Sequence, residues 1–305
     1  MSGQSNSLLA ILGPTASGKT TNAVRLAKSI GGEIISVDSR QIYRQMAIGT
    51  AKPTLEEQQS VRHHLIDTAD VDENFSAADF QRLADRAIQD IRQRGKVVLL
   101  VGGSGLYFRA LVDGLFSGPA GDENFRHQLK AQANTHGPQY LHRELQKVDP
   151  HTANKIHPNN LVRVIRALEV YHLSGQKMSD FQPAWDSESR YNFRAYVLKL
   201  DRQYLYQRIE TRVDKMIEHG WVQEVQDLLS AGYSPLAQPL RSFGYNELIN
   251  YLDGRTALDT AVEQIKLKTR RYAKRQLTWF RADQRLKWVD PEQLEDQVLS
   301  INFSQ

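Results

Sequence analysis

The chain has 305 residues, of which 40% are hydrophobic and 24% charged, so it is long enough for one large or two modest globular domains. It contains no cysteine, which excludes disulfides, thiolate zinc sites and a cysteine nucleophile and agrees with a reducing, cytoplasmic location. The net charge is only +4 and no apolar run reaches the length of a membrane span, so we expect no membrane association.

The first third of the chain alternates short apolar runs with helical patterns. Strands are predicted at 8–12, 33–37 and 97–101, and helices at 20–30 and 77–92. Because these runs are apolar on both faces, they predict a parallel sheet that is covered by helices on both sides. The predicted fold class is therefore α/β.

The character of the sequence changes after Leu115. A Ser-Gly-Pro-Ala-Gly break at 117–121 is followed by helical patterns at 122–148 and 161–173, a polar loop at 175–190 and a return strand at 196–200. We therefore predict a mainly helical insertion at 118–195 within an α/β core of residues 1–117 and 196–305. Helices are predicted over the rest of the core, at 202–229, 245–252 and 257–281.

A phosphate-binding motif follows the first predicted strand. The pattern G-x-x-x-x-G-K-[ST] of the P-loop is matched by Gly13, Pro14, Thr15, Ala16, Ser17, Gly18, Lys19 and Thr20. Backbone N–H groups of such a loop point at one anion, Lys19 would neutralise phosphate charge and the Thr20 hydroxyl would hold Mg²⁺. The motif predicts a P-loop NTPase-like core that binds a diphosphate or a triphosphate, and ATP is the usual ligand of such loops.

The position of the acidic residues argues against an ATPase or GTPase. In those enzymes an apolar strand usually ends in a Mg²⁺-binding Asp, but the strand at 97–101 ends in Gly102-Gly103-Ser104-Gly105. The acid appears instead as Asp38, after the strand at 33–37. Carboxyl ends of parallel strands meet at one edge, so Asp38 is expected beside the P-loop as a general base for transfer to an acceptor. The alternative is that Asp38 only caps the following turn.

A basic segment lies near the end of the chain. Residues 266–287 contain nine lysines and arginines but a single acid, Asp283, with Tyr272, Trp279 and Phe280 among them. This pattern is typical of a helix that contacts a phosphate backbone, and equally of a solvated face whose aromatic side chains pack inward.

Assembled in order, these features resemble the tRNA dimethylallyltransferases, also called tRNA isopentenyltransferases. The resemblance runs from Gly13 to about Trp288. Besides the P-loop it rests on Ile-Ser-Val-Asp-Ser-Arg-Gln-Ile-Tyr at 35–43, Ile-Gly-Thr-Ala-Lys-Pro at 48–53, and segments 63–67, 75–80, 101–107, 166–170, 244–245 and 270–279. The P-loop alone is shared with many proteins, whereas the ordered combination is specific.

The resemblance implies a reaction. The exocyclic N6 amine of the adenosine 3′-adjacent to the anticodon in tRNA attacks dimethylallyl diphosphate, and pyrophosphate leaves. Residues 13–20 would then hold the diphosphate rather than ATP, with Mg²⁺ as cofactor, and Asp38 would accept a proton or hydrogen bond from the amine. Lys19, Ser104 and Arg126 would stabilise the leaving diphosphate.

The resemblance also implies contacts with tRNA. The flipped base would be recognised by Asp38, Ser39, Arg40 and Gln41. Further contacts are expected from Val162, Arg163, Arg166, Arg241, Gly244 and Tyr245, and the basic helix would add Lys274 and Arg275. The chain departs from the family pattern at Ser104, where Thr is usual, and at Val162, where Gln is common, so a side-chain contact through Val162 is in doubt.

Three other functions stay open on the sequence. They are a small-molecule kinase, an RNA-binding switch without chemistry and an enzyme that prenylates free adenine nucleotides. No arginine-rich lid is recognised over the P-loop, which disfavours the kinase, and the insertion and basic helix are surplus to the third. The expected partners are the anticodon stem-loop of tRNA and dimethylallyl diphosphate, and we expect a monomer.

Overall fold

The computed structural model describes residues 7–115, 118–181 and 189–300. They form two compact units, the first made of Met1–Val112 with Arg190–Gln305 and the second of Asp113–Ser189. The second unit therefore begins and ends a few residues before the predicted limits of 118 and 195. Among the described residues, no helix is both long and apolar enough to cross a membrane.

The first unit is built on a sheet of six parallel strands, which confirms the predicted α/β class. The order across the sheet is β3-β2-β4-β1-β5-β6. The strands are β1 (Leu8–Leu12), β2 (Gly32–Val37), β3 (His63–His64), β4 (Val97–Gly102), β5 (Phe193–Leu198) and β6 (Lys287–Val289). β1 is buried along its whole length between β4 and β5, which explains its unbroken apolar run.

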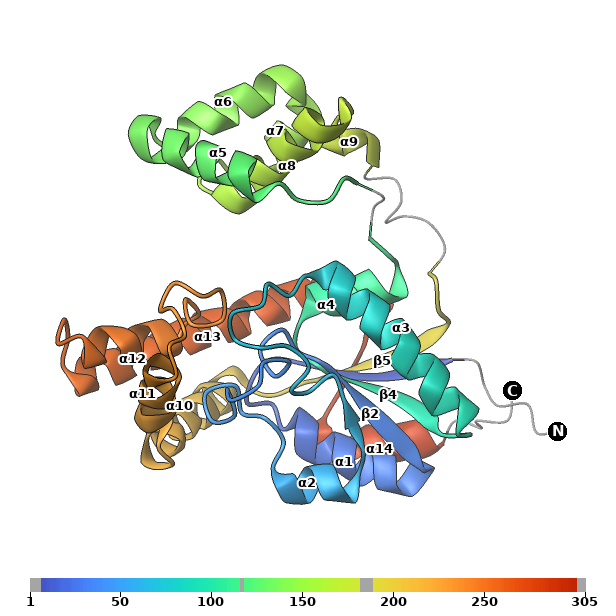
Figure 1. The fold of residues 1–305 in the computed structure, drawn as a ribbon. Helices are drawn as coiled ribbons and strands as arrows, with labels where there is room; N and C mark the ends of the chain where they lie inside the picture. The colour runs from blue at the N-terminus through green and yellow to red at the C-terminus, as the bar shows by residue number, and fades with distance from the viewer. Residues whose placement is uncertain (1–6, 116–117, 182–188, 301–305) are drawn as a thin grey trace. The chain divides into compact units, whose positions relative to one another are not determined.

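Helices cover both faces of the sheet (Figure 1). Those of the first unit are α1 (Lys19–Ile30), α2 (Leu55–Ser60), α3 (Ala77–Gln93), α4 (Gly105–Val112), α10 (Arg202–Glu218), α11 (Trp221–Ser230), α12 (Tyr245–Leu252), α13 (Leu258–Ala282), a 3-10 helix (Pro291–Gln293) and α14 (Leu294–Leu299). α3 starts with a capping box between Ser76 and Asp79 and buries Phe80 against one face. α1 and α14 bury Leu26 and Val298 against the other.

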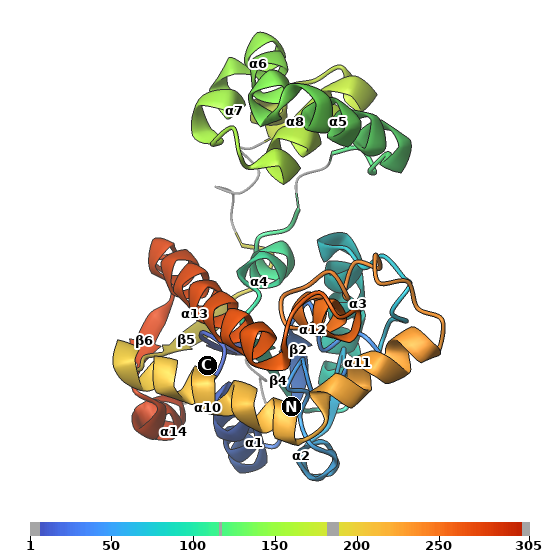
Figure 2. The same cartoon turned by 90° about the vertical axis from the view of Figure 1, so that its left-hand side faces the viewer.

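Two of the C-terminal helices pack on the carboxyl edge of the sheet. Leu205 and Ile209 of α10 and Ala273 of α13 contact Ala16 in the P-loop, and Figure 2 shows these two helices side by side. The sequence predicted one helix over 202–229, which is wrong. The chain breaks at Gly220, which has a φ of +94° that few residues other than glycine adopt, so α10 and α11 are separate helices.

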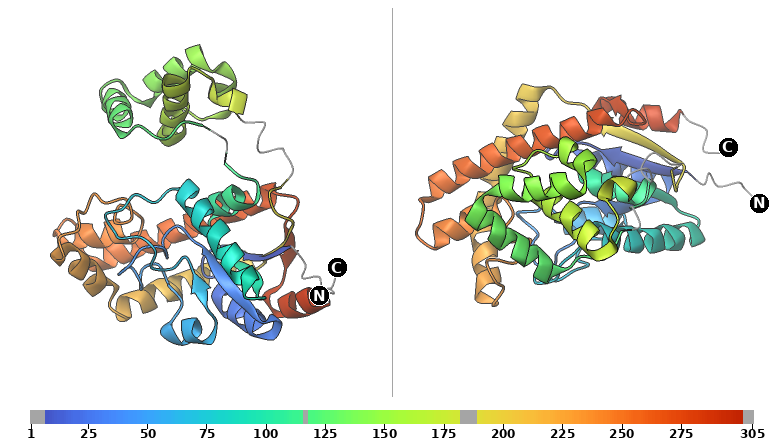
Figure 3. Two further views of the ribbon diagram at one scale, coloured as in Figure 1. Left: turned by 45° about the vertical axis from the view of Figure 1, so that its right-hand side comes forward. Right: turned by 90° about the horizontal axis from the view of Figure 1, so that it is seen from above.

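The second unit is a small helical bundle with its own core (Figure 3). Its helices are α5 (Glu123–His136), α6 (Pro138–Val148), α7 (Pro150–Lys155), α8 (Leu161–Ser174) and α9 (Met178–Phe181). Leu129, Leu145 and Val164 from three of these helices meet in the core. α9 lies within the segment that was predicted to be a loop.

The chain leaves the first unit after Val112 and returns at Arg190, and these two points are bound together. Arg190 N donates a hydrogen bond to Val112 O (2.7 Å), and the Arg190 guanidinium pairs with Asp85 (2.8 Å). Phe193 then pairs with Leu8 of β1. The return strand therefore begins three residues before its predicted position, which moves the domain boundary as well.

Glu169 of α8 is fully buried in the second unit. Its carboxylate accepts hydrogen bonds from Arg126 Nε (2.7 Å), Arg166 Nη1 (2.5 Å) and Asp122 N (2.7 Å). Burial alone would raise the pKa of Glu169, but the hydrogen bonds from the two arginines outweigh it and the pKa lies below its ordinary value. This buried carboxylate thus stabilises the second unit through its partners.

We predict that Glu169→Gln destabilises the second unit by about 3 kcal/mol, because the neutral amide no longer balances the charge that Arg126 and Arg166 bring to this buried carboxylate. Hydrogen exchange should accelerate in α5 and α8 and stay unchanged in β1 and β4. The exposed pair of Glu144 and Lys147 supplies the control Glu144→Gln, which should cost less than about 0.5 kcal/mol. Equal acceleration in both variants would contradict this prediction.

The same cluster gives a pH dependence. Because the folded-state pKa of Glu169 is lowered, its stabilisation is present above the unfolded-state pKa and is lost as pH falls through the folded-state value. Acid should therefore open the wild-type second unit, whereas Glu169→Gln should lack this contribution to the acid transition.

Candidate active site

The P-loop joins β1 to α1, as its sequence predicts. Gly18 is left-handed (φ +86°) immediately before α1, and Ala16 also has a positive φ (+63°), so the loop curls around the N-terminus of the helix. Ser17 Oγ is buried without a hydrogen-bond partner among the described residues. Because helix N-termini attract anions, the loop is a preformed cradle for a phosphate group.

Lys19 begins α1 and points back into this cradle, where its Nζ donates to Pro14 O (2.7 Å). Enclosure by the protein, and then the charge of Arg212, lower the pKa of Lys19 to about 7, while the Asp38 carboxylate acts in the opposite direction. A bound anion would stabilise the charged form. The charge on Lys19 therefore depends on whether a ligand is present.

Two arginines of α10 reach the same loop. Arg208 Nε donates to Ala16 O (2.8 Å), and Arg212 Nη1 lies 3.5 Å from Thr15 Oγ1. Burial lowers the pKa of Arg212, opposed by Asp38. No arginine-rich lid over the P-loop was expected from the sequence, yet these two arginines contact the loop. The two arginines are four residues apart and so share one helix face, but the pattern does not tell which partner that face meets.

Asp38 lies where the sequence placed it, directly after β2. Its Oδ1 accepts hydrogen bonds from Arg40 N (2.8 Å) and Gln41 N (3.4 Å), so it does cap the following turn. Its Oδ2 accepts no hydrogen bond from the described part of the chain. The carboxylate thus combines both roles that the sequence left open, because one oxygen fixes the turn and the other is available to a ligand.

These groups line one cavity of about 710 Å³ at the carboxyl edge of the sheet. Its lining includes Thr15, Lys19 and Thr20 of the P-loop, Asp38, and residues 49–53. The position agrees with the rule that ligands of parallel α/β sheets bind at the carboxyl ends of strands, where the strand order reverses. In this sheet the reversal occurs around β1.

Gln276 of α13 joins the P-loop to the end of β4. Its Oε1 accepts a hydrogen bond from Thr15 N (2.9 Å), and its Nε2 donates to Gly103 O (2.9 Å). A Cβ on Gly103 would lie 2.2 Å from Gln276 Nε2, so a side chain at this position would displace the Gln276 amide. Ser104 N donates to Val37 O (3.1 Å), and Ser104 itself is half-buried beside the cavity wall rather than within its lining. This role of Gln276 was not predicted from the sequence.

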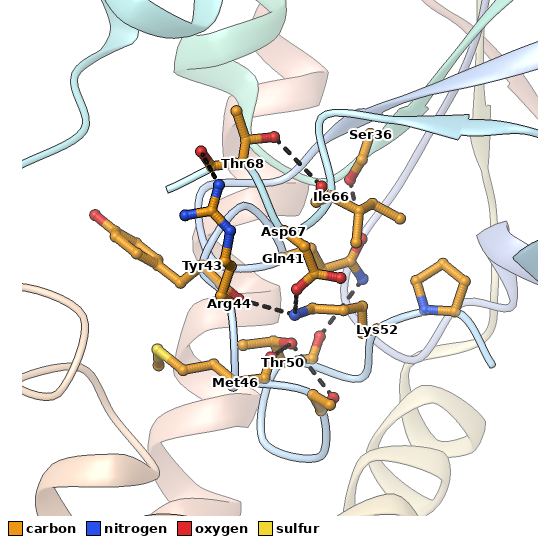
Figure 4. A network of polar contacts seen from close by, with 12 residues as sticks. Ser36, Gln41, Tyr43, Arg44, Met46, Thr50, Lys52, Ile66, Asp67 and Thr68 are labelled. Carbon is orange, nitrogen blue, oxygen red and sulfur yellow. Dashed lines mark hydrogen bonds and ion pairs between the residues drawn. The ribbon is translucent and has the colours of Figure 1, made fainter. Parts of the chain in front are cut away.

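Gln41, one of the residues expected to recognise the base, is held by a polar network (Figure 4). Gln41 Oε1 accepts from Ser36 Oγ (2.9 Å), and Gln41 Nε2 donates to Ala51 O (3.0 Å). The Arg40 guanidinium lies over the Phe243 ring, 5.3 Å from its centroid, and Ser39 is half-buried. The Gln41 amide is thus engaged in fixing the cavity wall.

Gly244 and Tyr245 are buried, which limits how they could meet tRNA. A Cβ on Gly244 would lie 2.4 Å from the Trp221 ring, and Tyr245 Oη donates to Glu224 Oε1 (2.7 Å). Tyr245 lines the cavity, so only a group inside the cavity can contact it. The glycine is explained by packing against Trp221.

Other predicted tRNA contacts lie on the surface of their own units. Arg241, Lys274 and Arg275 of the first unit are exposed.

In the second unit, Val162 and Arg163 are exposed at the start of α8. Arg126 and Arg166 are paired with Glu169, and Arg166 Nη2 also donates to Pro119 O (2.8 Å). Their guanidinium groups are therefore held in place by the second unit itself.

The cavity can be tested for its fit to Mg²⁺. This ion prefers oxygen ligands and is commonly held by one or two side chains together with substrate phosphates. Thr20 and Asp38 both offer oxygen atoms to the cavity that holds Lys19, while no group of three His, Cys, Asp or Glu side chains in the described ranges forms a metal cage. The donors present fit an ion that is bound chiefly through a diphosphate.

Comparison with known proteins gives matches over most of the chain. The family model described as IPP transferase matches residues 41–283. The tRNA dimethylallyltransferase of Geobacter metallireducens is 49% identical, with 96% of this chain and 95% of the relative covered. The tRNA dimethylallyltransferase 2 of Geotalea uraniireducens is 51% identical, with 93% of this chain and 92% of the relative covered.

Solved structures agree in fold. The tRNA isopentenylpyrophosphate transferase of Bacillus halodurans is 44% identical with a TM-score of 0.72, covering 97% of this chain and 96% of that chain. A eukaryotic dimethylallyltransferase acting on tRNA is 28% identical with a TM-score of 0.77, covering 93% and 74%. These matches confirm the resemblance stated from the sequence, and the chain belongs to the IPP transferase family.

Proposed function

We propose that this protein transfers a dimethylallyl group from dimethylallyl diphosphate to the N6 amine of the adenosine 3′-adjacent to the anticodon in tRNA. The observation that carries the proposal is the shared cavity, which is lined by the phosphate cradle with Lys19 and Arg212 and by Asp38, whose Oδ2 accepts no hydrogen bond from the described residues. Names of relatives with nearly full coverage of this chain support the same reaction class.

The cradle would stabilise the leaving group. Heterolysis of the bond between C1 of the dimethylallyl group and its oxygen places negative charge on the diphosphate, and donors fixed in advance lower the cost of that charge. Lys19, Arg208 and Arg212 are positioned around the P-loop for this purpose. Mg²⁺, held by Thr20 and the phosphate oxygens, would supply further neutralisation when bound.

Asp38 would act on the acceptor. The lone pair of the N6 amine is delocalised into the purine, so the amine attacks C1 well only if its proton can leave. As the N6–C1 bond forms, the proton passes to the Asp38 carboxylate and pyrophosphate departs with the electrons of the broken bond. The adenine must be flipped out of its stack to reach such a cavity. The exposed Lys274 and Arg275 would contact tRNA phosphates.

The direct test is incubation of the pure protein with dimethylallyl diphosphate, Mg²⁺ and unmodified tRNA, followed by mass analysis of the digested nucleosides. The expected product is a dimethylallyl adenosine that requires both substrates. Phosphate transfer from ATP to a small molecule, without a prenylated nucleoside, would refute the proposal in favour of a kinase. Prenylation of free adenine nucleotides alone would refute tRNA as the acceptor.

We predict that Asp38→Asn lowers the rate of transfer by about 10²–10⁴-fold, the usual contribution of a general base. Asn keeps an oxygen for the hydrogen bonds from Arg40 N and Gln41 N, so the turn should persist. Binding of dimethylallyl diphosphate, measured by calorimetry at pH 6.5, should be retained. Asp72→Asn on the exposed surface is the control, and wild-type turnover by Asp38→Asn would disprove the role as base.

The lowered pKa of Lys19 predicts proton uptake on diphosphate binding. With a free-protein pKa of about 7, Lys19 is mainly neutral at pH 8, and a bound anion restores its charge. Calorimetry in buffers of different ionisation enthalpy should show up to about 0.9 proton taken up per ligand at pH 8 from this group, and little at pH 6.

Two variants check that Lys19 is the group that titrates. Lys19→Met should abolish the uptake at pH 8 and weaken binding at both pH values. Arg212→Gln removes the neighbouring charge that lowers the pKa of Lys19, so it should reduce the uptake at pH 8. Undiminished uptake in Lys19→Met would assign the proton to another group.

A further inference from the structure

The Ile-Gly-Thr-Ala-Lys-Pro motif at 48–53 has no role in the mechanism above, although it belongs to the segments on which the resemblance rests. It lies in the connection between β2 and α2. Residues 49–53 line the cavity that also holds the P-loop and Asp38. The shape of the reaction cavity therefore depends on how this loop is held.

Glu224 of α11 binds the backbone of this loop. Its Oε2 accepts hydrogen bonds from Ala47 N (2.7 Å) and Ile48 N (2.6 Å), and its Oε1 accepts from Gly49 N (3.1 Å). Tyr245 Oη donates to the same Oε1 (2.7 Å). Successive N–H groups that converge on one anion form a strong and directional contact, because the acceptor is ionised.

The same turn also packs closely against α11 and α12 at Gly49. A Cβ on Gly49 would lie 2.1 Å from Trp221 Nε1 and 2.6 Å from Tyr245 Oη. Trp221 is the first residue of the helix that carries Glu224. The Glu224 carboxylate thus binds the loop to α11, and the Trp221 ring packs against the loop at Gly49. This close approach leaves no room for a side chain at position 49.

The loop in turn holds the groups next to Asp38 (Figure 4). Ala51 O accepts from Gln41 Nε2 (3.0 Å), and Gln41 N contacts the Asp38 carboxylate (3.4 Å). Lys52 Nζ donates to Tyr43 O (2.8 Å) and pairs with Asp67 (2.5 Å). A chain of contacts therefore leads from Glu224 through the loop to Asp38.

We propose that Glu224 is a positioning residue for the transfer reaction. It holds the loop of residues 47–53 in the conformation that places Gln41 and Asp38 against the acceptor. The inference rests on the proposed function. Glu224 lies outside the residues that line the cavity, so it acts through the loop and not on a substrate. It makes none of its hydrogen bonds to the P-loop, so the diphosphate cradle should not depend on it.

The test is Glu224→Gln, which keeps the size of the side chain but turns one acceptor oxygen into a donor facing N–H groups. Its matched control is Asp227→Asn, which removes a charge from the exposed face of the same helix. We expect kcat for transfer to tRNA to fall about 100-fold, the cost of a misplaced reacting group. The Kd for dimethylallyl diphosphate without tRNA should stay unchanged, and amide exchange at 47–49 should accelerate about tenfold.

Gly49→Ala is the second variant, since it pushes the same loop away from Trp221 while Glu224 is intact. It should reproduce the loss of kcat with unchanged diphosphate affinity. Wild-type kcat in both variants would overturn the proposal, and so would a parallel loss of diphosphate binding, which indicates general destabilisation. Absence of product with the wild-type protein would refute the proposed function. The contact between Glu224 and the loop is tested separately, by the rate of amide hydrogen exchange at residues 47–49.

Discussion

The excess of cationic over acidic side chains in one cavity is the physical constraint on which this active site depends. Lys19, Arg40, Lys52, Arg208, Arg212 and Lys215 line this cavity, whereas its acidic lining residues in the described part of the chain are Asp38 and Glu57. Enclosing cations without an anion costs free energy, because burial and like charges both disfavour the charged form. The lowered pKa of Lys19 has these causes. Apolar packing of α10 against Ala16 keeps Arg208 and Arg212 beside the P-loop. An anionic ligand would then neutralise the positive charge.

Close approach of backbone segments determines how near the reacting groups can come. A Cβ on Gly102 would lie 2.0 Å from Val37 O, and one on Gly105 would lie 2.2 Å from the Trp279 ring. Because these two glycines have no side chain, the ends of β2 and β4 can approach each other and Trp279 of α13 can pack against Gly105. The glycine-rich end of β4, which looked like a departure from the NTPase pattern, is thus a consequence of packing.

The parts of the structure that the sequence predicted are those with a local signal. The P-loop, the strands at Leu8–Leu12 and Val97–Gly102, and the position of Asp38 follow from short motifs and apolar runs. Arg208 and Gln276 escaped prediction because their partners are more than 170 residues away in the sequence. Two-residue β3 was missed because it is too short for a pattern. The roles of Ser104, Arg126 and the expected tRNA contacts stay predictions.

The hydrogen bond between Arg190 N and Val112 O joins the two ends of the sheet-bearing unit at the point where the second unit is inserted. The described residues between Asp113 and Ser189 contribute no strand to the sheet, and they bury their own apolar core and their own ion cluster. The insertion at 113–189, here called the helical cassette, can therefore be lengthened, shortened or exchanged at one junction without a change in the register of the strands. Sequence change in the helical cassette and in the catalytic core can therefore proceed largely independently over evolutionary time.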